Sequence, residues 1–227
     1  MRAALSVIIP TLNAAEVLPD CLISLMEGVQ EGLIRELVIS DGGSEDATLK
    51  IAEDAGAVIV HGAASRGGQL KRGAGAAPGE WLLFLHADSI LPAGWAGVVM
   101  AHMEKGGPAA FRLKFNAQGF APGFVAGWAN LRSRFGLPYG DQGLLVSRRD
   151  YAAAGGYPDI PLMEDVALAR TLRPALLPVP ITTSADKYIR DGWLRRGGRN
   201  LWTLLRYYCG VPPERLGREN EFASRHK

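Results

Sequence analysis

The sequence has little cysteine and no long apolar run. Its 227 residues include two cysteines, Cys21 and Cys209, which lie far apart and follow no metal-ligand spacing. We therefore expect neither a disulfide framework nor a cysteine-bound metal, but two free buried thiols. The longest uncharged stretches contain Gly, Pro, Asn and Gln, and they fall short of the ~20 apolar residues that a membrane-spanning helix requires.

The N-terminal apolar run imitates a secretory leader. It covers residues 3–9 after Arg2 and ends at once in Pro10-Thr11-Leu12-Asn13. This end comes too early for a hydrophobic region and a cleavage site, so a first β-strand is the better interpretation. We expect a cytoplasmic protein, and peripheral contact with the inner membrane stays open.

Charge is nearly balanced overall but uneven along the chain. The net charge is +2, yet residues 187–227 carry ten Lys and Arg against four acids, while residues 1–186 carry 19 acids against 15 bases. A basic C-terminal segment can attract phosphate groups, anionic lipid or nucleic acid, although it can equally be a solvated helix face. The segment contains no recognisable nucleic-acid-binding module, so we expect no nucleic acid as a partner.

The pattern of apolar residues predicts an α/β fold. Hydrophobic residues make up 48% of the chain and charged residues 21%, as is typical of globular proteins. Strands are predicted at residues 5–9, 36–40, 57–60 and 81–85, and helices at residues 13–26, 44–54 and 66–77. This alternation predicts βαβ units and a mainly parallel central sheet flanked by helices.

The second half has a looser pattern. Strands are predicted at residues 109–115, 143–146 and 176–181, and helices at residues 148–154, 163–172 and 192–208. Residues 120–135 form a Gly-interrupted segment rich in Phe and Trp, which we expect to line the acceptor side or to form a lid, with membrane docking or pairing of two subunits as alternatives. We expect one domain at residues 1–185 and a basic helical C-terminal extension at residues 186–227.

Acidic residues occur at three places where a parallel sheet presents its ligand-binding edge. Asp41 follows the second predicted strand, Asp88 follows the fourth, and Glu164-Asp165 begins a predicted helix. Ligands bind at this edge, so Asp41 is a candidate contact to a base or ribose. Asp88 is a candidate ligand of Mg or Mn, and a remaining carboxylate could act as a base. Asp88 and Asp165 also suit capping positions.

The stretch at residues 66–73, RGGQLKRG, surrounds a predicted helix start with cations, an amide and glycines. Such an environment suits a phosphate or a nucleotide. It contains no Gly-Lys-Ser/Thr, and no Gly-x-Gly-x-x-Gly follows the first strand, so neither a P-loop nor a dinucleotide-binding site is predicted. A surface helix with glycines for close packing is the alternative.

Four motifs occur in a recognisable order. They are SVIIPTLN at residues 6–13, VISDGGSEDAT at 38–48, RGGQLKRGAGAAPGEWLLFLHADS at 66–89 and MEDVALARTLR at 163–173. Together they resemble family 2 glycosyltransferases, which have the nucleotide-diphospho-sugar transferase (GT-A) fold. Within that family, Arg66-x-x-Gln69 combined with His86-Ala87-Asp88 most resembles the arsenosugar-biosynthesis-type group.

The resemblance implies a nucleotide-sugar site formed by Pro10, Thr11, Asn13, Asp41, Arg66, Gln69, His86 and Asp88. In this family pattern Asp41 matches the acid that contacts the base, and Asp88 matches the last acid of an Asp-x-Asp motif that holds Mn or Mg. Asp165, which follows Glu164, matches the general base for the acceptor hydroxyl. Tyr139-Gly140-Asp141-Gln142 resembles an acceptor-side loop, in which Asp141 is the second candidate for a catalytic acid or an acceptor contact.

The sequence also departs from the family pattern. His86 stands where the first acid of Asp-x-Asp is common, and Lys71 stands where Asn is common. Imidazole can still bind manganese or hydrogen-bond a ribose hydroxyl. The Gln-x-x-Arg-Trp motif of processive members is absent after Ile181, which argues against synthesis of a long polymer.

The resemblance therefore implies an inverting, metal-dependent glycosyltransferase. Its partners would be a nucleotide-sugar donor and a small-molecule or lipid-linked hydroxyl acceptor, and association into a homo-oligomer stays open. Two alternatives are a nucleotidyltransferase on a similar fold and a non-enzymatic scaffold whose basic tail binds membrane or nucleic acid. The first of these usually has a Gly-rich basic loop after its first strand, which is absent here.

Overall fold

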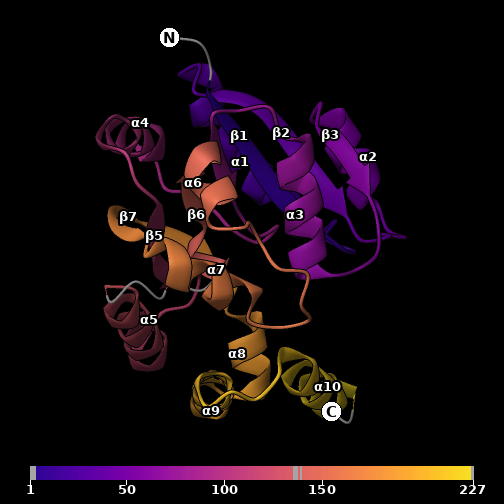
Figure 1. Cartoon of the computed structure of the whole chain (residues 1–227), viewed down its shortest axis with the longest axis vertical. Helices are drawn as coiled ribbons and strands as arrows, with labels where there is room; N and C mark the ends of the chain where they lie inside the picture. Colours follow the sequence, from indigo (N-terminus) through magenta and orange to yellow (C-terminus); the bar gives the residue numbers. More distant parts are fainter. Residues whose placement is uncertain (1–3, 135–137, 139, 226–227) are drawn as a thin grey trace.

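A seven-stranded sheet forms the centre of the computed structural model, which describes residues 4–134, 138 and 140–225 (Figure 1). The strands are β1 (Leu5–Thr11), β2 (Ile34–Asp41), β3 (Val58–His61), β4 (Trp81–Phe84), β5 (Ala109–Phe115), β6 (Leu144–Ser147) and β7 (Ala175–Thr183). Their order is β3-β2-β1-β4-β6-β5-β7. Neighbouring strands are parallel except where β6 pairs with β4 and β5. The predicted α/β fold with a mainly parallel sheet is confirmed.

Helices cover both faces of this sheet. They are α1 (Leu18–Gln30), α2 (Thr48–Asp54), α3 (Arg66–Ala76), α4 (Trp95–Lys105), α5 (Phe120–Ser133), α6 (Arg148–Ala153), α7 (Glu164–Leu172), α8 (Asp186–Asp191), α9 (Trp193–Tyr208) and α10 (Pro213–Arg225), with a short 3-10 helix, η1 (Gly140–Gln142). In β1, Val7 and Ile9 pack with α1 and α4, whereas Ile8 packs with α3. Full burial of each such side chain contributes about 1.5–3 kcal/mol, which explains why the strand is apolar throughout.

The start of α1 differs from the prediction. Asn13, the predicted first residue, instead has a φ of 49°, and its backbone N–H donates to Ser44 Oγ at 2.9 Å. The helix begins at Leu18, with Pro19 in its first turn. Ser44 does not cap α2 either, because that helix begins at Thr48 and the Ser44 hydroxyl bonds to Asp41 at 2.5 Å. Contacts between two loops therefore replaced the local capping that the sequence suggested.

Helix α4 was not predicted, and helices α8 and α10 lie in the predicted helical extension but were not predicted as separate helices. Helix α4 lies between Gly94 and Gly106, which both have a φ of 81°. It packs closely on α1, since a Cβ atom at Gly28 would lie 2.6 Å from the Trp95 ring. Cys21 is buried as expected, but Cys209 is exposed at the end of α9, so the prediction of a second buried thiol was wrong.

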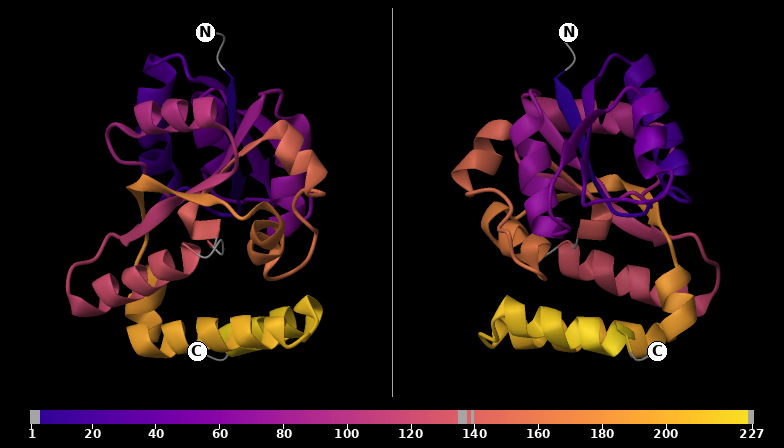
Figure 2. Two further views of the ribbon diagram at one scale, coloured as in Figure 1. Left: turned by 60° about the vertical axis from the view of Figure 1, so that its left-hand side comes forward. Right: turned by 90° about the vertical axis from the view of Figure 1, so that its right-hand side faces the viewer.

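The C-terminal helices form a layer at the end of the molecule opposite the N-terminus (Figure 2). Helices α8, α9 and α10 follow β7 directly, and α9 packs against α5, α8 and α10. The boundary proposed at residues 185 and 186 stays a prediction. Among the described residues, no helix is both long enough and apolar enough to span a bilayer. Phe135 and Tyr139, which belong to two predicted segments, lie outside the described residues.

Candidate functional site

A polar cavity of about 280 Å³ lies between the sheet and the C-terminal helices. Its charged and polar lining includes Arg66, His86, Asp88, Asp141, Glu164, Asp165, Thr183, Lys187, Tyr188, Arg196 and Asn200. The cavity thus brings together Asp88, the predicted metal ligand, Asp165, the predicted base, and His86. Six other predicted residues lie outside its lining: Pro10, Thr11, Asn13, Asp41, Gln69 and Gln142.

His86 and Asp88 reach the cavity because β4 ends immediately before them. The strand is buried between β1 and β6, and a turn follows in which Ser89 N–H donates to the His86 carbonyl at 3.1 Å. Asp88 Oδ2 accepts a hydrogen bond from Thr183 Oγ1 at 3.2 Å. The apolar strand therefore delivers an imidazole and a carboxylate to the carboxyl edge of the sheet.

Asp165 connects the start of α7 to η1. Its Oδ2 accepts a hydrogen bond from Gly140 N–H at 2.6 Å, and its Oδ1 accepts one from Val166 N–H at 2.7 Å. A Cβ atom at residue 140 would lie 2.9 Å from His86 Nε2 and 3.4 Å from Asp165 Oδ2. A glycine avoids this close contact, since any larger residue would require the His86 ring to shift.

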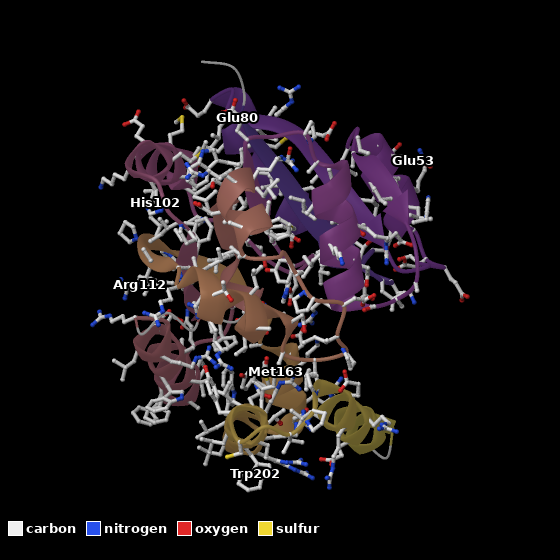
Figure 3. The ribbon with its side chains drawn as sticks, in the orientation of Figure 1. Glu53, Glu80, His102, Arg112, Met163 and Trp202 are labelled. Carbon is white, nitrogen blue, oxygen red and sulfur yellow. The ribbon has the colours of Figure 1, made fainter. Side chains whose placement is uncertain are left out.

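Met163 turns the chain into α7 through a left-handed conformation, with a φ of 68°. This conformation costs a non-glycine residue about 1–2 kcal/mol. The side chain is buried with Val166 and Leu204 of α9, and Figure 3 shows Met163 between the sheet and α9. Packing against the C-terminal layer therefore helps to hold Glu164 and Asp165 at the cavity.

Two cavity carboxyl groups have raised pKa values. Burial raises the pKa of Glu164 to about 7, and the Asp165 charge raises it further against the opposing effect of Arg66. Burial likewise raises the pKa of Asp141 to about 6, with Arg132 opposing and the Asp165 and Asp88 charges adding. Glu164 Oε1 and Asp141 Oδ1 are buried and have no hydrogen-bond partner among the described residues. Both carboxyl groups can therefore take up or release a proton near neutral pH.

Cationic side chains surround these acids. Arg66 Nε lies 3.7 Å from Glu164 Oε1, and half of the Arg66 side chain is exposed. Burial lowers the pKa of Lys187, with Arg66 adding to this effect and Asp88 opposing it. Burial, Arg66 and Lys187 together lower the His86 pKa well below its ordinary value. His86 is therefore a neutral imidazole at pH 7, with a lone pair for a metal or a hydrogen-bond donor.

Residues from the C-terminal segment were missed as individual site residues. Lys187, Tyr188 and Arg196 line the cavity from α8 and α9, and Thr183 lines it from the end of β7. The basic composition of residues 187–227 was the available signal. This composition could not single out Lys187, because the acids that share its cavity lie far from it in the sequence.

A separate polar cluster holds the ends of β1 and β2 together. Asp41 is fully buried, and its carboxylate accepts hydrogen bonds from Thr11 Oγ1, Gly43 N–H, Ser44 N–H and Ser44 Oγ at 2.5–2.9 Å. Burial alone would raise the Asp41 pKa, but the hydrogen bonds from Ser44, Gly43 and Thr11 outweigh it and lower the pKa. Gln69 Nε2 donates to the carbonyls of Thr11 and Ser40 at 2.7 and 2.9 Å.

The remaining predicted residues also have structural partners. Pro10 lies in β1 opposite Ser40, and Asn13 Oδ1 accepts a hydrogen bond from Glu45 N–H at 2.9 Å. Gln142 is fully buried, and its Nε2 donates to the Phe111 carbonyl at 3.0 Å. Direct contact of these side chains with a ligand stays a prediction.

The metal prediction rests on Asp88, and His86 is a second donor that could bind either the metal or a ribose hydroxyl. Among the described residues, no cluster of three or more His, Cys, Asp or Glu side chains is arranged to hold a metal ion. A neutral imidazole and a carboxylate nevertheless line one cavity, and Mg and Mn commonly use one or two carboxylates together with substrate oxygens. The donor set therefore fits a cation shared with a bound phosphate group.

Comparison with known sequences identifies glycosyltransferases. Residues 6–130 match the family model described as Glycosyl transferase family 2. A PGL/p-HBAD biosynthesis glycosyltransferase of Mycobacterium bovis (strain BCG / Pasteur 1173P2) is 45% identical over 93 residues, which cover 38% of this chain and 36% of that protein. The chain thus matches about a third of the length of this curated relative.

Solved structures with a similar fold include three that contain a nucleotide or a nucleotide sugar. S. aureus TarS 1-349 in complex with UDP has a TM-score of 0.62 at 17% identity, covering 81% of this chain and 60% of that one. Mannosyltransferase PcManGT from Pyrobaculum calidifontis with GDP-Man and Mn2+ has a TM-score of 0.63 at 19% identity, covering 86% and 61%.

Glucosyl-3-phosphoglycerate synthase from Mycobacterium tuberculosis, in complex with Mn2+, UDP and glucosyl-3-phosphoglycerate, has a TM-score of 0.59 at 21% identity and covers 92% of this chain and 81% of that one. These likenesses confirm the predicted GT-A fold. The narrower resemblance to the arsenosugar-type group stays a prediction. The family match extends over more than half of the residues, and the chain belongs to glycosyl transferase family 2.

Proposed function

We propose that this chain transfers a sugar from a nucleotide-diphospho-sugar donor to an acceptor hydroxyl, with inversion at the anomeric carbon. The main supporting observation is the single cavity in which Asp165 and Glu164 face the His86-Asp88 turn and the cations Arg66 and Lys187. The donor class is supported by the relatives, since PcManGT was solved with GDP-Man and the synthase with UDP. Family membership favours glycosyl transfer over the nucleotidyl transfer that was the alternative.

Asp165 is the proposed base. Its two hydrogen bonds from backbone N–H groups fix the carboxylate at the start of α7. The acceptor oxygen attacks the anomeric carbon while its proton passes to this carboxylate. The new carbon–oxygen bond forms as the bond to the diphosphate breaks, and the nucleoside diphosphate leaves with the electron pair. Attack opposite the leaving group inverts the anomeric centre.

Arg66 and Lys187 are proposed to stabilise the leaving diphosphate. Both line the cavity, and each is close enough to lower the His86 pKa. Positive charge already in place where negative charge develops lowers the barrier more than charge that must reorganise. A divalent cation, when bound, would be held by Asp88 and His86 and would add Lewis-acid stabilisation of the diphosphate.

A panel of nucleotide sugars tests this function. We expect release of nucleoside diphosphate from one donor class when a hydroxyl acceptor is supplied. We also expect UDP or GDP to raise the melting temperature, and Mn to increase that shift. A chain that no nucleoside diphosphate stabilises, with or without Mn, would contradict the proposal. Determining the anomeric configuration of the product by NMR tests inversion separately.

A further inference from the structure

Helix α5 exposes an apolar stripe. Phe120, Phe124, Trp128 and Leu131 are 86%, 60%, 52% and 46% exposed. Their spacing of four, four and three residues places them on one helical face. The opposite face supplies Ala129 and Val125 to a cluster with Leu113 and Phe115 of β5. The helix is therefore anchored to the sheet by one face and presents a second apolar face outward.

Helix α9 exposes a second stripe. Leu194, Leu201, Leu205 and Tyr208 are 83%, 40%, 49% and 43% exposed and share one face, and the adjacent Trp202 is 62% exposed. Figure 3 shows Trp202 on the outer side of α9. The two helices pack together, and Trp128 and Leu201 line the same small cavity of about 50 Å³. The stripes therefore meet, and we call them together the α5/α9 surface.

The α5/α9 surface lies within a basic part of the chain. Residues 117–134 contain Arg132 and Arg134 but no acid, and residues 187–227 carry ten Lys and Arg against four acids. On α9 the exposed Arg195 directly follows Leu194. Some α9 arginines are neutralised, since Arg199 pairs with Asp191 and Arg206 pairs with Glu219. Residues 187–227 nevertheless contain six more basic than acidic residues, and the exposed Arg195 lies beside the stripe on α9.

We propose that the α5/α9 surface docks on an anionic lipid bilayer. Contiguous exposed apolar side chains mark an interaction site, and a helix face with Trp, Phe and Leu beside Arg is typical of interfacial membrane binding. Anionic lipid headgroups complement the basic flanks. A symmetric contact between two copies would instead bring the same basic segments together, so charge favours lipid over a second copy.

This surface adjoins the polar cavity. The small cavity between α5 and α9 is lined by Leu113, Leu201 and Leu204, and it shares Asp141, Tyr188 and Asn200 with the polar cavity. An amphiphilic acceptor in the bilayer could therefore place its hydroxyl near Asp165 and its apolar part between the helices. This extension to the acceptor rests on the proposed function, whereas bilayer docking does not.

Vesicle sedimentation without any substrate tests the docking. The full chain should sediment with vesicles of phosphatidylcholine and phosphatidylglycerol, and less with phosphatidylcholine alone or at high salt. The variants Phe120→Ser/Phe124→Ser and Leu194→Ser/Trp202→Ser should each bind about tenfold more weakly or worse, because each loses two side chains that enter the interface. Ile23→Ser, which changes a 68% exposed side chain on α1, is the matched control and should bind normally.

Tryptophan quenching keeps the test independent of variant folding. Brominated lipid in anionic vesicles should quench the fluorescence of the unaltered chain, and Trp128→Phe/Trp202→Phe should lose most of that quenching. Absence of vesicle binding, or binding unchanged in both serine pairs, would overturn the proposal. Light scattering that shows a dimer, abolished by the serine pairs and accompanied by no vesicle binding, would assign the surface to a second copy and would also overturn it. Lack of glycosyl transfer would leave the bilayer result intact.

Discussion

Two polar clusters of this molecule shift the pKa values of their carboxylates in opposite directions. At the ends of β1 and β2, Asp41 is fully buried, yet protein donors satisfy it so well that its pKa is lowered. In the polar cavity, Glu164 and Asp141 are buried with unpartnered oxygens, and their pKa values are raised to about 7 and about 6. Unpaired buried polar groups cost stability. The difference teaches that protein donors satisfy the carboxylate of the first cluster, whereas the second cluster has carboxylate oxygens without a protein hydrogen bond among the described residues.

After removal of the proposed base, the largest effect is expected at Asp88. Asp88→Asn keeps the acceptor for Thr183 but removes the charge, so we expect nucleoside diphosphate release to fall by about 10²–10³-fold, as for loss of one electrostatic stabiliser of a leaving group. The Mn-dependent part of the nucleotide-induced shift in melting temperature should also disappear. Asp54→Asn, which loses only a surface pair with Lys50, serves as the control. Equal activity in both variants would show that Asp88 carries no such charge-dependent role.

The second largest effect is a loss of stability at Asp41. Asp41→Ala leaves four donors without their acceptor, so we expect the free energy of unfolding to fall by about 3 kcal/mol in urea titration. Because the folded-state pKa is lowered, the stabilisation by Asp41 is present above the unfolded-state pKa and is lost as pH falls through the folded-state pKa. The unfolding free energy of the variant should therefore lack this pH-dependent contribution. Unchanged stability would place Asp41 among residues kept for ligand contact alone.

The third effect is a pH dependence at Glu164. Its folded-state pKa of about 7 exceeds the ordinary 4.5, so the folded protein binds the proton more tightly and loses stability as pH rises between these values. Glu164→Gln should remove this decline, which we expect to amount to about 3 kcal/mol. Melting curves between pH 4.5 and 8 measure it. Parallel curves for the variant and the unaltered chain would show that the Glu164 carboxyl titrates normally.

The smallest effect is expected at Gln69. Gln69→Leu leaves the carbonyls of Thr11 and Ser40 without their side-chain donor, so we expect a loss of about 1 kcal/mol in unfolding free energy. The melting temperature shift induced by a nucleoside diphosphate should persist, because Gln69 does not line the polar cavity. Loss of nucleotide binding with unchanged stability would reverse the comparison and give Gln69 a direct binding role.

Much of the fold could be predicted because a central strand is buried on both faces and therefore consists of a continuous apolar run. Strand β5 and the cores of β1, β2 and β4 have the predicted residues. The prediction of where α1 begins was wrong because this start depends on contacts between Asn13 and a loop more than thirty residues away. Such contacts leave no periodic signal in a single sequence.

The polar cavity could be predicted only in part, for the same reason. Asp88, Glu164 and Asp165 were identifiable from strand ends and the family resemblance, and they do meet in one cavity. Lys187 joins them through the return of β7 to the sheet, which places Thr183 beside Asp88 across 95 residues of sequence. The internal use of Asp41 and Gln69 was also hidden, since their hydrogen-bond partners are set by tertiary packing.

The most direct measurement of the central claim is turnover by Asp165→Asn under saturating donor and acceptor, together with its nucleotide-induced thermal shift. We predict that nucleoside diphosphate release falls by about 10²–10⁴-fold, as expected when a general base is removed, while the thermal shift with nucleotide is retained. Turnover close to that of the unaltered chain would contradict the account, because the cavity carboxylate held by Gly140 and Val166 would then not be the base.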